Sequence, residues 1–123
     1  MKGMAAHPIQ FDEEAMNFKD TATRFERAES GTDSFKMLAK DAYQAMKDDP
    51  GNAGLYFVIG VAAQSYVRRY EDQGVAPEFA DKAKAILVGY NAKIVEALAG
   101  DAGTRLRLLG EVALDYEWQV QDF

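Results

Sequence analysis

Hydrophobic residues recur every three or four positions along most of the chain, and prolines and glycines divide it into helix-length segments. This spacing lines apolar side chains along one face of an α-helix, and no stretch shows the alternation that is typical of a strand. We therefore expect five helices, over residues 10–28, 33–48, 53–72, 77–98 and 105–122. Joined by short connections, they predict an all-α fold, an antiparallel helical bundle of packed hairpins.

The segment 53–72 is the most apolar of the five and is expected to lie at the centre of the bundle. Its first three turns are apolar on nearly every side, which is typical of a helix that neighbours cover from several directions. Asn52, in the turn before it, is the expected N-cap. The uninterrupted apolar run, residues 54–63, covers ten positions, whereas a helix that spans a bilayer needs roughly 20. We therefore expect no membrane-spanning segment.

The length of 123 residues fits a single domain, 1–123, that can bury its own core. Residues 1–9 precede the first periodic segment and are expected to be a mobile N-terminal arm. The chain has no cysteine, which excludes disulfides and thiol chemistry and is typical of a reducing compartment. The first residues also lack the apolar core of a signal peptide, so we expect a cytoplasmic, bacterial protein.

The net charge narrows the kind of partner. The chain carries 20 acidic and 14 basic side chains, a formal charge of −6, and neither half concentrates one sign. Binding to nucleic acid or to an anionic membrane requires clustered positive charge that neutralises phosphates. We therefore expect neither of these partners, and a basic protein fits the charge better.

The chain offers few groups for catalysis or for holding a cofactor. Its one histidine, His7, precedes a proline in the expected mobile arm and has no second histidine to share a metal with. No glycine pattern of a nucleotide-binding loop is present. We expect no catalytic residue, no metal and no cofactor, and an enzyme is the less favoured interpretation.

The last predicted helix, 105–122, has two distinct apolar groups. On a wheel of about 100° per residue, its core face should consist of Leu108, Leu109, Val112, Ala113, Tyr116 and Val120. Leu114 and Trp118, the only tryptophan, lie outside that face and are neighbours four residues apart. The carboxylates on the same side as this pair are Glu111, Asp115 and Asp122.

An apolar pair bordered by carboxylates is typical of a recognition surface, in which an aromatic side chain anchors a partner and the charges steer it. We expect a small, non-enzymatic module that binds a basic protein, such as a toxin or nuclease that it neutralises in the manner of an immunity protein. A symmetric self-contact would bring carboxylates against their own copies. In the competing interpretation, Trp118 is covered by another segment of the chain and belongs to the core.

Two alternative functions remain open. Tyr66, Arg68, Arg69 and Tyr70 fall near one another at the end of the central helix and could hold an anionic ligand, as in a small-molecule sensor or an enzyme. The simpler interpretation is that these arginines meet the negative end of the helix dipole and pair with nearby acids. The second alternative is a structural subunit of a homo-oligomeric assembly.

Overall fold

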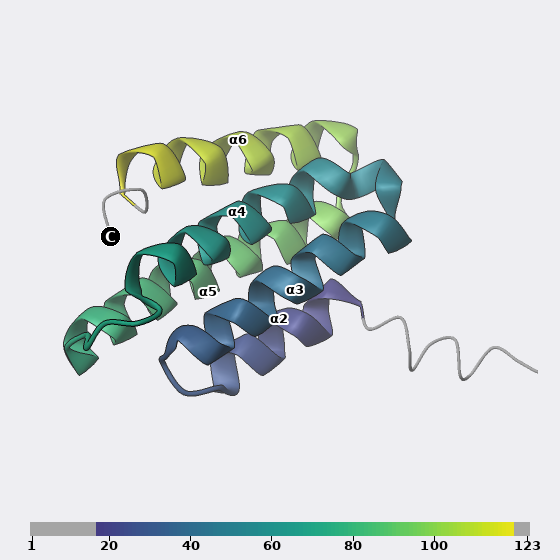
Figure 1. Cartoon of the computed structure of the whole chain (residues 1–123). Helices are drawn as coiled ribbons and strands as arrows, with labels where there is room; N and C mark the ends of the chain where they lie inside the picture. Colours follow the sequence, from purple (N-terminus) through teal and green to yellow (C-terminus); the bar gives the residue numbers. More distant parts are fainter. Residues whose placement is uncertain (1–16, 120–123) are drawn as a thin grey trace, which may run out of the picture.

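The computed structural model describes residues 17–119, which form five α-helices and no strand (Figure 1). They are α2 (Phe18–Arg27), α3 (Thr32–Asp48), α4 (Ala53–Tyr70), α5 (Pro77–Ala99) and α6 (Ala102–Trp118), with a short 3-10 turn, η1 (Pro50–Asn52), before α4. The predicted all-α helical bundle is confirmed. The expected arm 1–9 and the outer parts of the first and last predicted helices lie outside the described residues.

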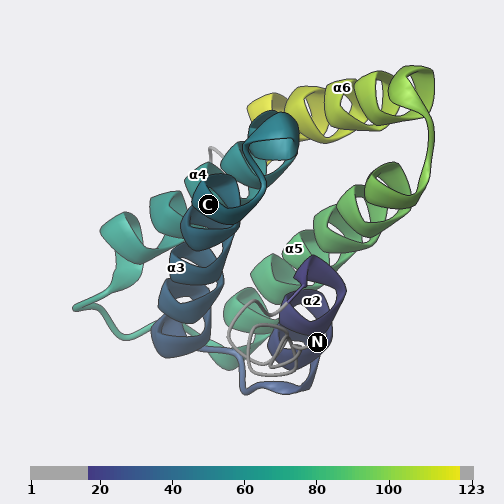
Figure 2. The same cartoon turned by 90° about the vertical axis from the view of Figure 1, so that its right-hand side faces the viewer.

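The helices pack in two pairs with α6 along one edge. α3 and α4 lie side by side and antiparallel, on one side of the molecule, and α2 and α5 lie on the other (Figure 2). α4 contacts α3, α5 and α6, so the most apolar segment has neighbours on three sides, as expected. α6 packs mainly against α5 and α4 and leaves much of its remaining surface to the solvent.

The turn between α3 and α4 is organised by Asp49 and not by the predicted cap. The Asn52 side chain accepts no helix amide; its Nδ2 donates to Asp49 Oδ2 at 2.9 Å. The Tyr56 hydroxyl donates to the same oxygen at 2.7 Å. These two hydrogen bonds hold the pKa of Asp49 below its usual 3.8, and the bond from Asn52 has the larger effect. One carboxylate thus connects the turn before α4 to the first turn of that helix.

A row of aromatic rings crosses the core from α2 to α5. Phe25 meets Phe35 edge to face at 5.2 Å between ring centroids, and Phe35 stacks on Tyr66 at 4.0 Å. Tyr66 contacts Tyr70 at 5.0 Å, and Tyr70 contacts Phe79 at 5.3 Å. Such pairs contribute roughly 0.5–1.5 kcal/mol each beyond the burial of their surface. The row therefore joins α2, α3, α4 and α5 in one core.

The side-chain amide of Asn91 is buried in this core without a hydrogen-bond partner among residues 17–119. Asn91 of α5 is 1% exposed, and neither its Oδ1 nor its Nδ2 has a hydrogen-bond partner among the described residues. Burying an amide in that state costs about 1–3 kcal/mol. The buried amide of Asn91 therefore makes the folded protein less stable than an apolar side chain at this position would.

Candidate functional site

Helix α6 is fixed to the bundle by one narrow face. Asp101 caps its start by accepting the Thr104 N–H at 2.8 Å. Leu108 and Val112 are buried against α4 and α5, with Leu109 and Tyr116 half-buried beside them. Ala113 and Val120 were also expected on the core face. Ala113 is exposed instead, and Val120 lies outside the described residues.

Ala113 is exposed because α6 packs as the outermost helix, with neighbours on one side only. Ala113 occupies one edge of the predicted apolar arc and is exposed there. The buried face of α6 is thus narrower than the arc of apolar residues on the helical wheel. Part of the apolar surface that the sequence assigned to the core therefore faces solvent.

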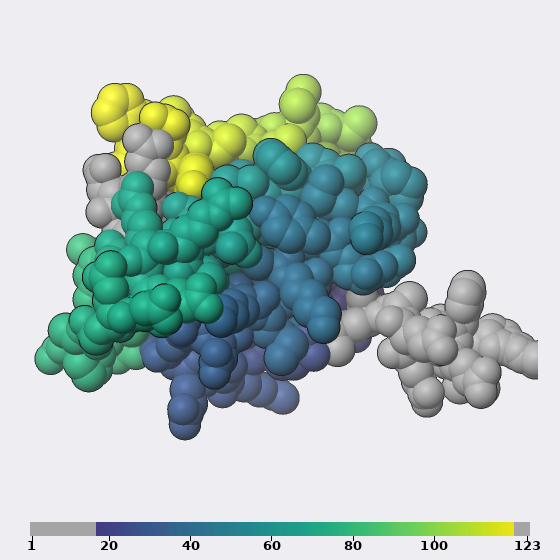
Figure 3. Space-filling view, viewed as in Figure 1, coloured from purple at the N-terminus to yellow at the C-terminus, as the bar shows by residue number. Residues whose placement is uncertain are grey.

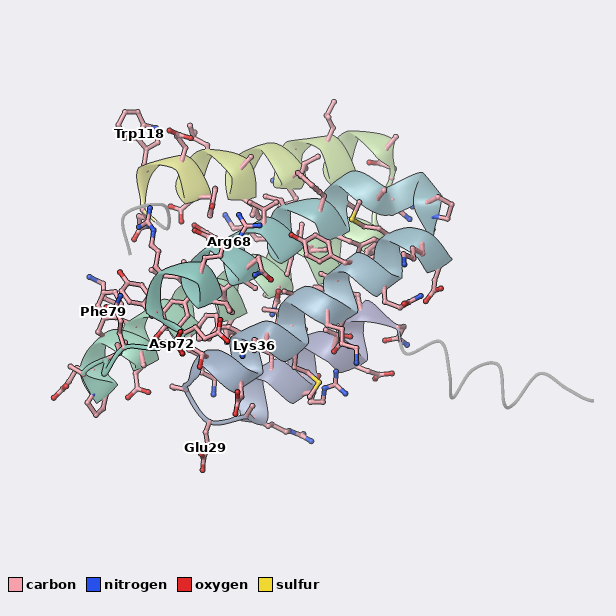
Figure 4. All side chains as sticks on the ribbon, viewed as in Figure 1. Glu29, Lys36, Arg68, Asp72, Phe79 and Trp118 are labelled. Atoms are coloured by element: carbon pink, nitrogen blue, oxygen red, sulfur yellow. The ribbon has the colours of Figure 1, made fainter. Side chains whose placement is uncertain are left out.

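Trp118 and Leu114 are exposed side chains. Trp118 is 75% exposed and Leu114 is 63% exposed, and Figure 4 shows Trp118 standing away from the bundle at the end of α6. No described segment folds over this pair, so the interpretation of Trp118 as a covered core residue has no support from residues 17–119. In Figure 3, α6 forms the upper rim of the molecule, above α4.

The exposed apolar surface extends further along α6 than the predicted pair. Leu106 is 73% exposed, and it precedes Leu114 and Trp118 on the same ridge of residues spaced four apart. Gly110 occupies the remaining position of this ridge, and a side chain there would meet open space. We call the four residues Leu106, Gly110, Leu114 and Trp118 the α6 ridge. Sequence reasoning missed Leu106, although the four-residue spacing would have found it.

The carboxylates beside the ridge are engaged within the molecule. Glu111 accepts hydrogen bonds from Lys93 of α5 and from Arg107, both at 3.0 Å. These bonds hold the pKa of Glu111 below its usual 4.5, and the bond from Lys93 has the larger effect. Asp115 accepts from the Tyr90 hydroxyl at 2.5 Å and from the Gln119 side chain at 2.9 Å.

Glu111 and Asp115 therefore each connect α6 to α5, and each also bonds to a side chain four residues away along the chain. Their negative charge is shared with these donors, so less of it remains to attract a partner directly. Asp122, the third predicted acid, lies outside the described residues. The α6 ridge is thus flanked by partly satisfied carboxylates and not by free ones.

The four residues of the alternative site point in two directions. Tyr66 is 2% exposed and belongs to the aromatic row, as does Tyr70. Arg68 and Arg69 line a small hollow between α3, α4 and α6, together with Tyr43 and other residues. The structure therefore brings the two arginines together with tyrosines of other helices, and not with Tyr66 and Tyr70. A single helical wheel carries no information on such partners from neighbouring helices.

A wider hollow of about 550 Å³ lies between α2, α3 and the loop that joins them. Its walls include Phe25, Leu38 and Met37, and Met37 is 48% exposed. Two of the charged groups that line it are paired with each other, since the Arg24 guanidinium contacts the Asp41 carboxylate. Its lining also includes the carboxylates of Glu29 and Asp33 and the hydroxyl of Thr32, so it is a mixed polar and apolar hollow.

The described residues contain no group of three or more histidine, cysteine or acidic side chains arranged to hold a metal ion. Within the same part of the chain, no helix has the length and apolar content needed to cross a membrane. No protein-family model matches the sequence, and comparison with curated proteins and with solved structures finds no significant similarity.

Proposed function

We propose that this protein is a binding module that recognises another protein through the α6 ridge. The observation that carries the proposal is the exposure of Leu106, Leu114 and Trp118 on one side of a single helix. They are three of the five large apolar side chains that are exposed among residues 17–119. Scattered exposed leucines need no explanation, whereas several large apolar side chains on one face of a helix, with a tryptophan among them, are typical of an interaction site.

The helix itself supplies a second argument. Gly110, in the middle of α6, costs roughly 1 kcal/mol of helix stability relative to alanine. No neighbour requires its small size, because a Cβ atom at this position would meet nothing within 4 Å. Because Gly110 has no side chain, it leaves a notch between Leu106 and Leu114 that a side chain of the partner can occupy. This use of the notch accounts for a residue that the fold does not need.

The net charge of the chain favours a basic partner. With Glu111 and Asp115 engaged by donors of their own, we assign the attraction to the whole molecule, whose formal charge is −6. Such a field accelerates the encounter with a positively charged protein and is screened by salt. A basic toxin or nuclease that the protein neutralises is one partner of this kind.

The test is a capture experiment with the immobilised full-length chain and a lysate of the source organism, followed by mass spectrometry. The wild type is compared with a Leu114→Ala/Trp118→Ala variant, in which the two anchors are removed. Met37→Ala is the matched control, because it removes an exposed apolar side chain from α3. We expect the double variant to bind the captured partner about 30-fold more weakly or worse, and the control to bind it as the wild type does.

Equal capture by the wild type and the double variant would refute the α6 ridge as the binding surface. With the purified partner, the association rate should fall as the ionic strength rises, and a salt-independent rate would contradict the electrostatic part of the proposal. Light scattering on the protein alone provides a further check. A homo-oligomer that the double variant dissociates would mean that the ridge binds a second copy instead of a basic partner.

A further inference from the structure

The hollow that contains Arg68 is built from three helices. It has a volume of about 280 Å³ and lies where α3 and α6 flank the exposed side of α4. Figure 4 shows Arg68 in the space between α4 and α6. The residues that line it are Tyr43, Val61, Gln64, Ser65, Arg68, Arg69 and Tyr116. Arginine, tyrosine, serine and glutamine side chains all donate hydrogen bonds, and no carboxylate is among these described lining residues.

Five of the six donor side chains that line this hollow have no partner within the described part of the molecule. The side chains of Tyr43, Gln64, Ser65, Arg68 and Tyr116 make no hydrogen bond or ion pair with another described residue. Four other cations, Arg24, Lys36, Lys93 and Arg107, are each paired with a carboxylate. Arg68 forms no such ion pair with a described residue, so its guanidinium donors remain open to a ligand in the hollow.

A close approach between α3 and α4 places Tyr43 at the hollow. A Cβ atom on Gly60 would lie 2.5 Å from Tyr43 Cε1, so the ring sits where only glycine leaves room on α4. Burial raises the pKa of the Tyr43 hydroxyl, the charge of Arg68 opposes that rise, and Tyr116 adds to it. These influences place both Arg68 and Tyr116 near the Tyr43 hydroxyl, so donors from three helices face one space.

We propose that this hollow binds an oxyanion, a phosphate or carboxylate group carried by a small molecule with a single ring. The Arg68 guanidinium and the hydroxyls of Tyr43 and Tyr116 bind the oxygens, because charge-assisted hydrogen bonds to a guanidinium are the strongest that a protein offers to such groups. Val61 and the faces of the tyrosine rings contact the apolar part of the ligand. The volume lies just below the 300–1,000 Å³ that is usual for drug-sized ligands, so the ligand is small.

This site is separate from the α6 ridge and does not rest on the proposed protein partner. Tyr116 lies on the side of α6 that faces the bundle, whereas Leu114 and Trp118 are on the exposed side. The Leu114→Ala/Trp118→Ala variant should accordingly bind the oxyanion as the wild type does. The two sites can therefore be tested independently.

The experiment is an NMR titration of the full-length chain with phenyl phosphate, with benzoate and with benzyl alcohol as the uncharged analogue. We expect the backbone amides of Tyr43, Arg68 and Tyr116 to shift with either or both anions and not with the alcohol. Binding to phenyl phosphate alone identifies a phosphate ester as the ligand class, and binding to benzoate alone identifies a carboxylate. No shift in the hollow with either anion, or an equal effect of the alcohol, overturns the proposal.

Variants separate this site from general attraction of anions to arginine. Arg68→Gln should weaken binding about 10-fold or more, because it removes the charge and the forked pair of donors. Tyr43→Phe keeps the ring beside Gly60 and should weaken binding about threefold to tenfold. Arg27→Gln is the matched control, since Arg27 is also an exposed arginine in the last turn of its helix. An Arg68→Gln variant that binds as tightly as Arg27→Gln would also overturn the proposal.

Discussion

Replacing Asn91 by leucine should make the protein more stable. The side chain is 1% exposed on α5, and its amide has no hydrogen-bond partner among the described residues, so the substitution breaks no bond seen there. Leucine has the same number of side-chain heavy atoms as asparagine, with two bulkier methyl groups in place of the amide oxygen and nitrogen, and buried helix positions accept it readily. The substitution therefore tests whether a polar atom in this core is a cost to the fold.

The magnitude follows from the two states of the amide. In the unfolded chain water satisfies it, whereas in the folded chain it loses that hydration at a cost of about 1–3 kcal/mol. Leucine removes this cost, gains apolar burial and has a slightly better helix propensity, while the extra bulk offsets part of the gain. We expect Asn91→Leu to raise the free energy of unfolding by about 2 kcal/mol, which corresponds to roughly 6–10 °C in Tm for a domain of this size.

Urea unfolding followed by far-ultraviolet circular dichroism measures this change. The midpoint should rise while the m-value stays constant, because the surface exposed on unfolding hardly differs. Asn91→Ala serves as the companion variant: it removes the amide but leaves a cavity, so it should stay well below Asn91→Leu in stability. A fall of 1 kcal/mol or more in Asn91→Leu would refute the reasoning, since the cost of the buried amide would then be smaller than the cost of the extra bulk.

Two further predictions concern α6 and the turn before α4. Trp118→Ala should change the free energy of unfolding by less than about 0.5 kcal/mol, whereas Val112→Ala, at a site with no exposed surface, should lower it by about 1–3 kcal/mol; a similar loss in both would place Trp118 in the core. The pKa of Asp49 is lower in the folded chain than its usual 3.8, so its contribution is present above that value and is lost as the pH falls through the folded pKa. Between about pH 6 and pH 3, the Asn52→Ala/Tyr56→Phe variant should therefore lose less stability than the wild type in urea titrations, and an equal loss would contradict this role of Asp49.

Much of the fold could be predicted because the residues at the ends of the helices mark where each helix begins and ends. Pro50 and Gly51 interrupt the chain between α3 and α4, Pro77 starts α5, and Gly100 follows its end. The predicted central helix, 53–72, ends two residues earlier in the structure, at Tyr70. Signals of this kind act within a few residues, so a single sequence is enough to read them.

The candidate sites were harder to predict because they depend on contacts between helices. The wheel correctly separated Leu114 and Trp118 from the buried Val112, since their angles on one helix are fixed by its geometry. It could not show that Lys93, on α5, engages Glu111, because that pairing depends on how the two helices are placed side by side. In the same way, it grouped Tyr66 with its neighbours in sequence, although Phe35 of another helix determines where its ring lies.

The exposure of Trp118 has a practical consequence for spectroscopy. It is the only tryptophan of the chain, and three quarters of its surface is already in water in the folded state. Its fluorescence should therefore change little when the protein unfolds, and tryptophan emission would give a misleading picture of stability. The same fluorophore lies at the end of the α6 ridge, so a partner that covers the ridge should shift its emission to the blue. Trp118 would thus report on the proposed association far more than on folding.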